Sequence, residues 1–189
     1  DKMIDPESVT RLFNITPKVG AVVIGLIADG RSVVAQTRQE VVDFEYKNGY
    51  PMPASMIAKR VGDIAQVNTQ HAGRRTMAVE MMLVSIDDEA GPQLFMVSPA
   101  GDYSGFKACA SGAKAQEATS ILEKEVAKND KMNFNQAVQT AVMTLQETVA
   151  ADFKSDELEI GVIEHADDVF HRLAPGEIDA YLDAIKERD

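Results

Sequence analysis

Residues 91–112 run Gly-Pro-Gln-Leu-Phe-Met-Val-Ser-Pro-Ala-Gly-Asp-Tyr-Ser-Gly-Phe-Lys-Ala-Cys-Ala-Ser-Gly, and this stretch decides the fold. A short apolar run at Leu94–Val97 is followed by turn residues at Pro99–Asp102 and a second run at Tyr103–Ala110. Such a pattern is typical of two strands joined by a tight turn. Ser111 then offers a hydroxyl that can cap the next helix. The stretch therefore predicts strand, turn, strand and helix start in immediate succession.

Two strands and two helices are expected before this stretch. The runs Ser8–Ile15 and Ala21–Ile27 predict a hairpin, with Asp29-Gly30-Arg31 ending its second strand. Apolar residues at helical spacing then predict one helix over Val34–Asn48 and another that starts near Pro53 and ends at His71-Ala72-Gly73. A further strand, Ala78–Ile86, leads through an acidic turn into residue 91.

The C-terminal part predicts three helices and one strand. An apolar stripe from Ala115 to Val126 indicates a helix after Gly112, which Lys128–Lys131 breaks. Asn133 and Gln136 have the spacing of a capping box ahead of an amphipathic helix that reaches Val149. Leu158–Ile163 is the last expected strand, and Pro175 is well suited to open the final helix.

The order of these elements predicts one domain over residues 1–189, of the α+β class. The helices come in pairs between groups of strands, whereas a βαβ alternation would separate successive strands by single helices. Paired helices suit the outer faces of stacked, mainly antiparallel sheets. We therefore expect two sheets between helical layers.

Composition excludes several function classes. The 189 residues carry a net charge of −11, which argues against a nucleic-acid binder that would neutralise phosphates with Lys and Arg. No apolar run approaches the roughly 20 residues of a membrane helix, and no signal peptide is expected. The single cysteine, Cys109, cannot form an internal disulfide and fits a reducing compartment.

The residues themselves predict no active site, metal site or cofactor. No paired-histidine or cysteine spacing suggests zinc, and each histidine has a structural interpretation. Ser104 is not in a nucleophile elbow, and Cys109 has no adjacent base, so we expect a turn-adjacent serine and a buried inert thiol. Asp29 and Arg31 are interpreted as a local charge pair that caps the following helix.

Several motifs resemble the alpha subunits of the proteasome family, and the resemblance spans essentially the whole chain. Three C-terminal segments look particularly like the alpha type-6 branch of that family: Asp152-Phe153-Lys154, Glu177-Ile178-Asp179-Ala180 and Glu187-Arg188-Asp189. The other motifs are Gly91-Pro92-Gln93-Leu94-Phe95, Pro99-Ala100-Gly101, Phe106-Lys107-Ala108, Gly25–Arg31, Lys59-Arg60-Val61 with Gln66 and Thr69-Gln70, and Leu122-Glu123-Lys124.

The resemblance implies the N-terminal-nucleophile hydrolase fold, a four-layer αββα sandwich. Family members carry about two further strands, a first helix and a gating tail ahead of the position of Asp1, so we expect this chain to lack them. The catalytic beta subunits of the family use the amine and hydroxyl of an N-terminal threonine. A carboxylate residue such as Asp1 cannot supply that chemistry.

The family also implies a function. We expect a non-catalytic alpha-ring subunit of the 20S proteasome core, which restricts access to the chamber and docks activators in ubiquitin-dependent degradation, in cytoplasm and nucleus. The implied partners are neighbouring alpha subunits, beta-ring subunits and the tails of regulatory ATPases or other activators. Two alternatives stay open, a catalytic beta-type threonine protease relative and a free-standing interaction domain.

Two sets of site residues carry over from the family. The loop after the second helix lines the pore in the family, and here it comprises His71, Ala72, Gly73 and Arg74. The activator pocket uses a lysine opposite a Gly-Leu pair, and here Arg11 faces Gly25 and Leu26. A second departure follows the loop, because Arg75-Thr76-Met77-Ala78 stands where the family has Arg-Pro, an apolar residue and Gly.

Overall fold

The computed structural model describes residues 3–5, 8–165 and 168–187. Asp1, Arg188 and Asp189, on which parts of the sequence interpretation rest, lie outside these residues. The elements in chain order are β1 Leu12–Thr16, β2 Val19–Gly25, α1 Ile27–Asn48, α2 Ala54–Gln70, β3 Val79–Asp87, β4 Gly91–Val97, β5 Tyr103–Gly105, α3 Ala115–Lys128, α4 Phe134–Val149, the 3-10 turn η2 Ser155–Glu157, β6 Gly161–Val162, β7 His171–Arg172 and α5 Pro175–Lys186.

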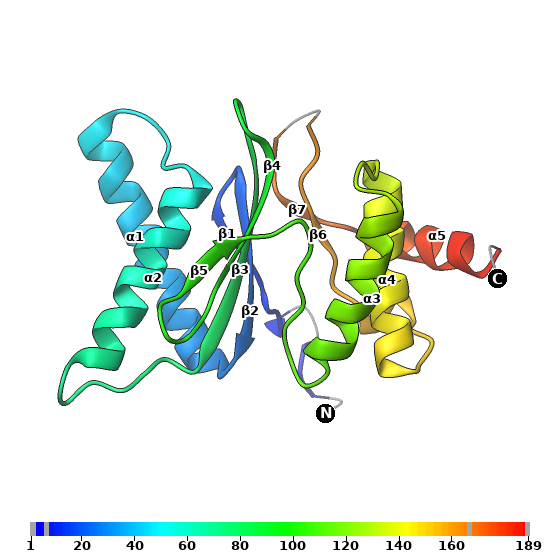
Figure 1. Ribbon diagram of the computed structural model, residues 1–189, viewed down its shortest axis with the longest axis horizontal. Coiled ribbons are helices and arrows are strands. Elements are labelled where there is room, and N and C mark those ends of the chain that lie inside the picture. Colours follow the sequence, from blue (N-terminus) through cyan, green and yellow to red (C-terminus); the bar gives the residue numbers. More distant parts are fainter. Residues whose placement is uncertain (1–2, 6–7, 166–167, 188–189) are drawn as a thin grey trace.

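Five strands form one antiparallel sheet in chain order, β1-β2-β3-β4-β5 (Figure 1). β2 pairs with β3 over its whole length, from Val19 opposite Ser85 to Gly25 opposite Val79. This register sets the end of β2 beside the start of β3. Alternate residues of β3 are buried, among them Met81 and Leu83, because one face of the strand packs on helices.

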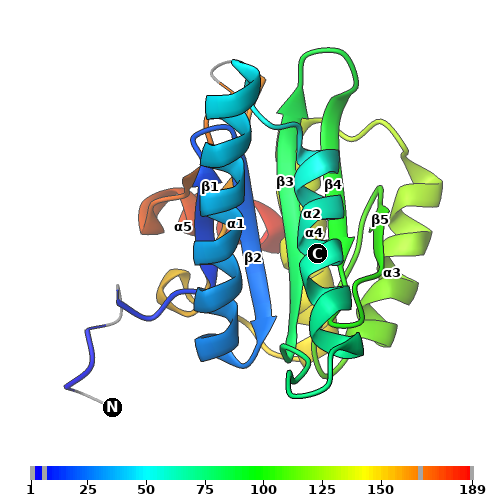
Figure 2. The ribbon, with the colours of Figure 1, turned by 90° about the vertical axis from the view of Figure 1, so that its left-hand side faces the viewer.

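Helices α1 and α2 cover that face of the sheet and run alongside its strands (Figure 2). The main core lies between these two helices and the sheet, and it includes Val34, Ile57, Val61, Met81 and Leu83. On the outside, the guanidinium of Arg60 donates two hydrogen bonds to the carboxylate of Glu40 and so joins the two helices.

Helix α2 touches the turn between β4 and β5 backbone to backbone. A Cβ added at Gly62 would lie 2.7 Å from the carbonyl oxygen of Gly101, and one added at Gly101 would lie 2.7 Å from that of Gly62. Gly101 also has a φ of +95°, which side chains rarely adopt. Glycine at both positions lets the turn between β4 and β5 dock closely on α2.

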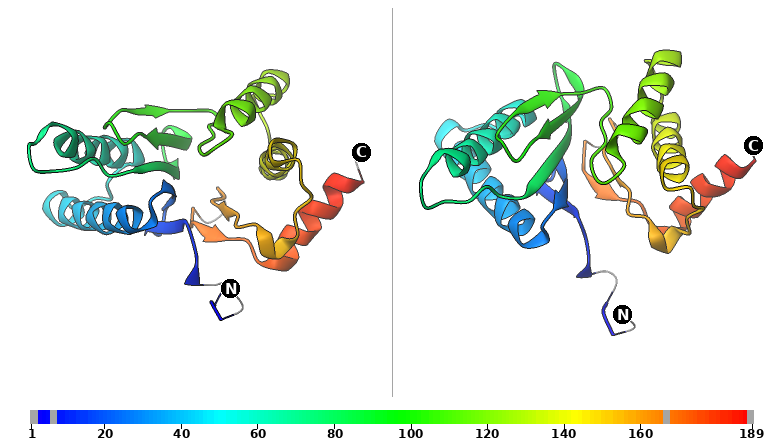
Figure 3. Two further views of the ribbon diagram at one scale, coloured as in Figure 1. Left: turned by 90° about the horizontal axis from the view of Figure 1, so that it is seen from below. Right: turned by 60° about the horizontal axis from the view of Figure 1, so that its bottom comes forward.

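The remaining elements form two further layers on the other side of the five-stranded sheet (Figure 3). β6 and β7 pair as a small antiparallel sheet, and α4 and α5 pack against it. Val142, Val162, Leu173, Ile178 and Leu182 are buried in this second core. Helix α3 lies beside α4, and the amine of Lys114 donates to the carbonyl of Thr148 at the end of α4.

Phe170 connects the two sheets. Its ring is 3% exposed and occupies the space above two glycines, since a Cβ added at Gly20 or Gly161 would lie 2.1 or 2.5 Å from it. Its N–H donates to the carbonyl of Pro17, and its own carbonyl accepts from the amide of Asn14. The segment before β7 is therefore fixed to the β1–β2 hairpin.

The architecture confirms the predicted fold class. Helices, antiparallel sheet, second sheet and helices follow one another across the molecule, as in the αββα order (Figure 1). The helix pairs, the hairpin and the succession β3-β4-β5 are also confirmed. The capping box of α4 is present, with Asn133 accepting from the N–H of Gln136 and the Gln136 side chain accepting from that of Asn133.

Several features of the N-terminal and central parts differ from the prediction. The first strand begins at Leu12 and not at Ser8. Asp29-Gly30-Arg31 does not end a strand, because α1 already begins at Ile27 and the N–H of Gly30 bonds the carbonyl of Leu26. The strand expected over Tyr103–Ala110 stops at Gly105. Ser111 does not cap α3, which begins at Ala115; its hydroxyl donates to the carboxylate of Glu80 instead.

The last expected strand was too long. Only Gly161–Val162 of the predicted Leu158–Ile163 is paired, and the sequence predicts no strand at its partner, His171–Arg172. A strand of two residues is too short to show the alternation on which strand prediction depends.

Candidate functional site

The two predicted sets of site residues lie at the same end of the molecule. The end of β2, the start of α1 and the loop after α2 all lie at its lower end in Figure 2. The N–H of Leu26 donates to the carbonyl of Ala78 at 2.9 Å, and Gly25 pairs with Val79. The chain that leaves the loop therefore enters the sheet directly beside Gly25 and Leu26.

Arg11, Gly25 and Leu26 form one exposed surface at this end. The Nη1 of Arg11 donates to the carbonyls of Gly25 at 3.1 Å and Val23 at 3.4 Å, so the sheet edge holds the guanidinium beside Gly25. Leu26 follows with its side chain 51% exposed. The structure thus brings together the three residues that the resemblance named for the activator pocket.

Gly25 has two reasons to be glycine. Its φ is +123°, a backbone conformation that side chains rarely adopt. A Cβ there would also lie 2.1 Å from the carbonyl oxygen of Ala78. The close approach of β2 to the segment before β3 depends on this residue.

An acidic residue, Glu159, lies beside Arg11 and has no signal in the sequence. The carboxylate of Glu159 accepts from the hydroxyl of Thr10 at 3.2 Å, from the backbone N–H of Arg11 at 3.3 Å and from Arg172 at 3.4 Å. Arg172 also donates to the carbonyl of Leu12. Glu159 is 148 positions from Arg11, and no local pattern connects the two.

The loop His71–Arg74 is exposed throughout. The N–H of His71 donates the last helical hydrogen bond of α2, to the carbonyl of Val67. The N–H of Arg74 donates to the carbonyl of His71 at 3.2 Å and so forms a turn. Gly73 has a φ of +85°, and no atom of the residues that the structure describes lies within 4 Å of a Cβ added there. Glycine at this position is explained by the backbone conformation of the turn and not by close packing. The tip of the loop projects into solvent.

Asp29 has a different partner from the predicted one. Its carboxylate is bound by the guanidinium of Arg75, with Nη1–Oδ2 at 2.6 Å and Nη2–Oδ1 at 2.7 Å, and by the N–H of Ala78 at 3.0 Å. Arg31, the expected partner, is exposed on α1. The hydrogen bonds from Arg75, followed by that from Ala78, lower the pKa of Asp29 from 3.8 to about 2.

The nominal nucleophiles lack the surroundings of catalytic groups. Ser104 is exposed on β5, opposite Met96. Cys109 is half-buried, and burial together with the charge of Glu80 raises its pKa to about 11, which keeps the thiol protonated at neutral pH. Within the described ranges, no three His, Cys, Asp or Glu side chains converge as metal ligands.

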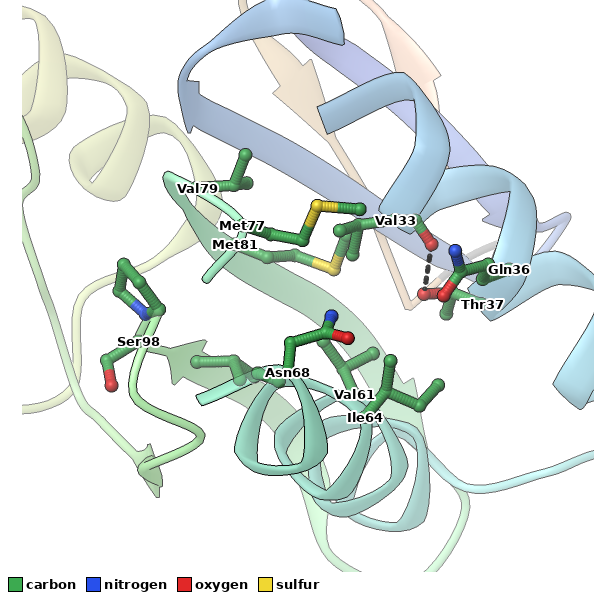
Figure 4. Close-up of a pocket in the computed structure, with 13 residues that line it drawn as sticks. Val33, Gln36, Thr37, Val61, Ile64, Asn68, Met77, Val79, Met81 and Ser98 are labelled. Carbon is green, nitrogen blue, oxygen red and sulfur yellow. Dashed lines mark hydrogen bonds between the residues drawn. The ribbon is translucent and has the colours of Figure 1, made fainter. Parts of the chain in front are cut away.

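A small cavity lies in the main core between α1, α2 and the sheet (Figure 4). The thioethers of Met77 and Met81 and the side chains of Val33, Val61 and Ile64 line it, and the Thr37 hydroxyl beside it donates to the carbonyl of Val33. Its volume of about 20 Å³ is on the scale of a water molecule. The cavity is too small for an organic ligand.

No helix among the described residues is long and apolar enough to cross a membrane.

Comparison with known proteins gives consistent matches. The family model described as "Proteasome subunit" matches residues 1–163. A probable proteasome subunit alpha type-1 of Schizosaccharomyces pombe is 46% identical over 190 residues, covering 100% of this chain and 78% of the relative. A proteasome subunit alpha type-6 of Caenorhabditis elegans is 34% identical, covering 100% and 77%. A proteasome subunit alpha of Methanopyrus kandleri is 33% identical, covering 86% and 65%.

These names are all of the alpha class, so the beta-type alternative is wrong. Both type-1 and type-6 names occur among the relatives, and the type-6 resemblance of the C-terminal motifs stays a prediction.

Proposed function

This chain belongs to the proteasome subunit family as an alpha-type member, and from that premise we propose that it is a non-catalytic subunit of the outer ring of the 20S core, which restricts the passage of substrates and docks activators. The observation that carries the proposal is the similarity to alpha subunits along the whole chain. Its neighbours in the particle are other alpha subunits and the subunits of the beta ring.

The absence of proteolytic activity is part of the proposal. One candidate nucleophile is removed by burial, which raises the pKa of Cys109 to about 11, since a protonated thiol is a poor nucleophile at neutral pH. We further propose that the subunit works in ubiquitin-dependent degradation in cytoplasm and nucleus. A single cysteine, without a partner for an internal disulfide, suits those reducing compartments.

Sedimentation of the chain from its source cells tests the proposal most directly. A ring subunit sediments in a very large particle together with other subunits, because obligate assemblies bury large apolar interfaces. A free-standing interaction domain sediments near its own mass, 20.6 kDa for these residues. Sedimentation of the whole cellular pool as a monomer would overturn the ring assignment.

We propose that His71, Ala72, Gly73 and Arg74 line the pore of the ring. The exposure of the loop and the turn at Gly73 support this role. Replacing Arg74 with Glu reverses a charge at the aperture, so particles with this variant should degrade acidic and basic unfolded chains in an altered ratio. Lys131→Glu makes the same charge change on the exposed connection between α3 and α4 and should leave the ratio unchanged. If the ratio of acidic to basic chains degraded is the same in the Arg74→Glu and Lys131→Glu particles, the pore role is contradicted.

We propose that Arg11, Gly25 and Leu26 form a docking pocket for the C-terminal tail of an activator. The guanidinium held beside Gly25 and the exposed Leu26 support it, because a tail offers a carboxylate and apolar side chains. Arg11→Ala should weaken binding of a tail peptide about tenfold, the scale of one charge-assisted hydrogen bond. Arg31→Ala, an exposed arginine on α1, is the control, and unchanged affinity in the Arg11 variant rules the pocket out.

A further inference from the structure

The segment Arg75–Ala78 joins the loop His71–Arg74 to β3, and a single carboxylate holds it at both ends. Asp29 accepts two hydrogen bonds from the guanidinium of Arg75, and its Oδ2 also accepts from the N–H of Ala78. The carboxylate is 4% exposed on the first turn of α1. It therefore closes these four residues against the start of the helix.

The same segment is bound to the candidate docking pocket. The carbonyl of Ala78 accepts from the N–H of Leu26, and the absence of a side chain at Gly25 allows that carbonyl its close approach. Both backbone polar groups of Ala78 are therefore hydrogen-bonded, the N–H to the carboxylate of Asp29 and the carbonyl to the N–H of Leu26. The pocket backbone and the base of the loop share this residue.

Among the described residues, the tip of the loop has no comparable support. Its backbone turn is closed by the bond between Arg74 and His71, and its four residues are exposed. Its position is therefore determined by the two ends of the loop, which are α2 on one side and Arg75 on the other.

We propose that Asp29 and Arg75 are positioning residues, which fix the base of the loop His71–Arg74 against Gly25 and Leu26 and so hold the pore aperture and the docking pocket in one geometry. This inference rests on the proposed function. The lowered pKa of Asp29, about 2, keeps its carboxylate ionised well below the neutral range.

The test uses assembled core particles that contain this subunit with a nitroxide label on the loop. Cys109→Ala removes the native thiol and Ala72→Cys supplies the labelling site. Electron paramagnetic resonance then reports the mobility of the label. Asp29→Asn and Arg75→Gln should at least double the mobile fraction of the label, and Arg75→Lys, which keeps the charge and loses the bidentate geometry, should give an intermediate value.

Two controls separate positioning from general loosening. Arg60→Gln removes the bidentate pair with Glu40 between α1 and α2, and should leave the loop label unchanged. A second label at Glu89, in the turn at the opposite end of β3, should be unaffected by all variants.

The inference is overturned if the mobile fraction of the loop label is unchanged in both Asp29→Asn and Arg75→Gln. It is also overturned if Arg60→Gln raises that fraction as much as these two variants do. Where a variant does not assemble, the same labels are compared in the free chain, which contains both partners of the ion pair. Failure of the unmodified chain to enter particles contradicts the proposed function alone, and the label comparison in the free chain still decides the inference.

Discussion

The carboxylate of Asp29 lies in the first turn of α1, almost removed from water, and accepts three hydrogen bonds. An acidic group at this place also interacts favourably with the positive end of the helix dipole. The hydrogen bonds and the helix dipole both favour the ionised form of the carboxylate. The contact joins the starts of α1 and β3, so its loss affects both elements.

The pH dependence of stability should report this contact. The folded pKa of Asp29 is about 2, against an ordinary value of 3.8, so its contribution to the free energy of unfolding is complete above about pH 5 and is lost as the pH falls from about 4 to 2. We expect the difference in urea stability between wild type and Asp29→Asn to be constant at neutral pH and to shrink over that acid range. A difference that stays constant down to pH 2 would show that the carboxylate is not stabilised as its contacts indicate.

At the scale of elements, α4 is the helix whose start is specified most completely by local sequence. Asn133 and Gln136 satisfy each other's backbone N–H groups, and buried Val138 and Val142 continue the helix toward the second core. The helix therefore combines a local start signal with an apolar face.

Removing the cap should destabilise the protein measurably. Asn133→Ala leaves the N–H of Gln136 without its side-chain acceptor and should lower the free energy of unfolding by about 1 kcal/mol, within a range of roughly 0.5–2 kcal/mol. Asn133→Ser retains an acceptor and should be nearly neutral. Thermal unfolding followed by circular dichroism compares the variants, and equal losses for Ala and Ser would exclude a capping role.

At the scale of the whole molecule, two separate cores are joined through Phe170. One core lies between α1, α2 and the five-stranded sheet, and the other lies among α4, α5, β6 and β7. The ring packs on Gly20 from the first part and on Gly161 from the second. We propose that this link makes residues 1–189 one cooperative domain.

Truncation of Phe170 tests that proposal. Phe170→Ala should cost about 3–5 kcal/mol, the usual loss for a buried phenylalanine. It should also separate the unfolding of the two parts into distinct transitions in urea. Phe106, which is 39% exposed, provides the control, since Phe106→Ala should change stability by roughly 0.5 kcal/mol or less. A single transition with a loss below about 1 kcal/mol would show that the parts are joined elsewhere.

Local patterns were sufficient wherever an element carries its own signals. The cap of α4, the proline that opens α5 and the apolar alternation of β3 are all legible within a few residues, and each predicted the observed element. The prediction of a strand up to Ala110 is wrong because β5 pairs with β4 only up to Gly105, and pairing is a property of two segments.

The sequence by itself determined the class of fold, the order of its elements, and the family, through motifs that extend over the chain. It also singled out Arg11, Gly25, Leu26 and the loop His71–Arg74, without saying how they lie in space. The tertiary structure alone decided that Asp29 binds Arg75 rather than Arg31, that Glu159 lies beside Arg11, and that Phe170 joins the two sheets. Residues at least 46 positions apart meet in the contacts of Asp29 with Arg75, of Arg11 with Glu159 and of Gly20 with Phe170. Their partners are selected by the packing of whole elements and not by any pattern along the chain.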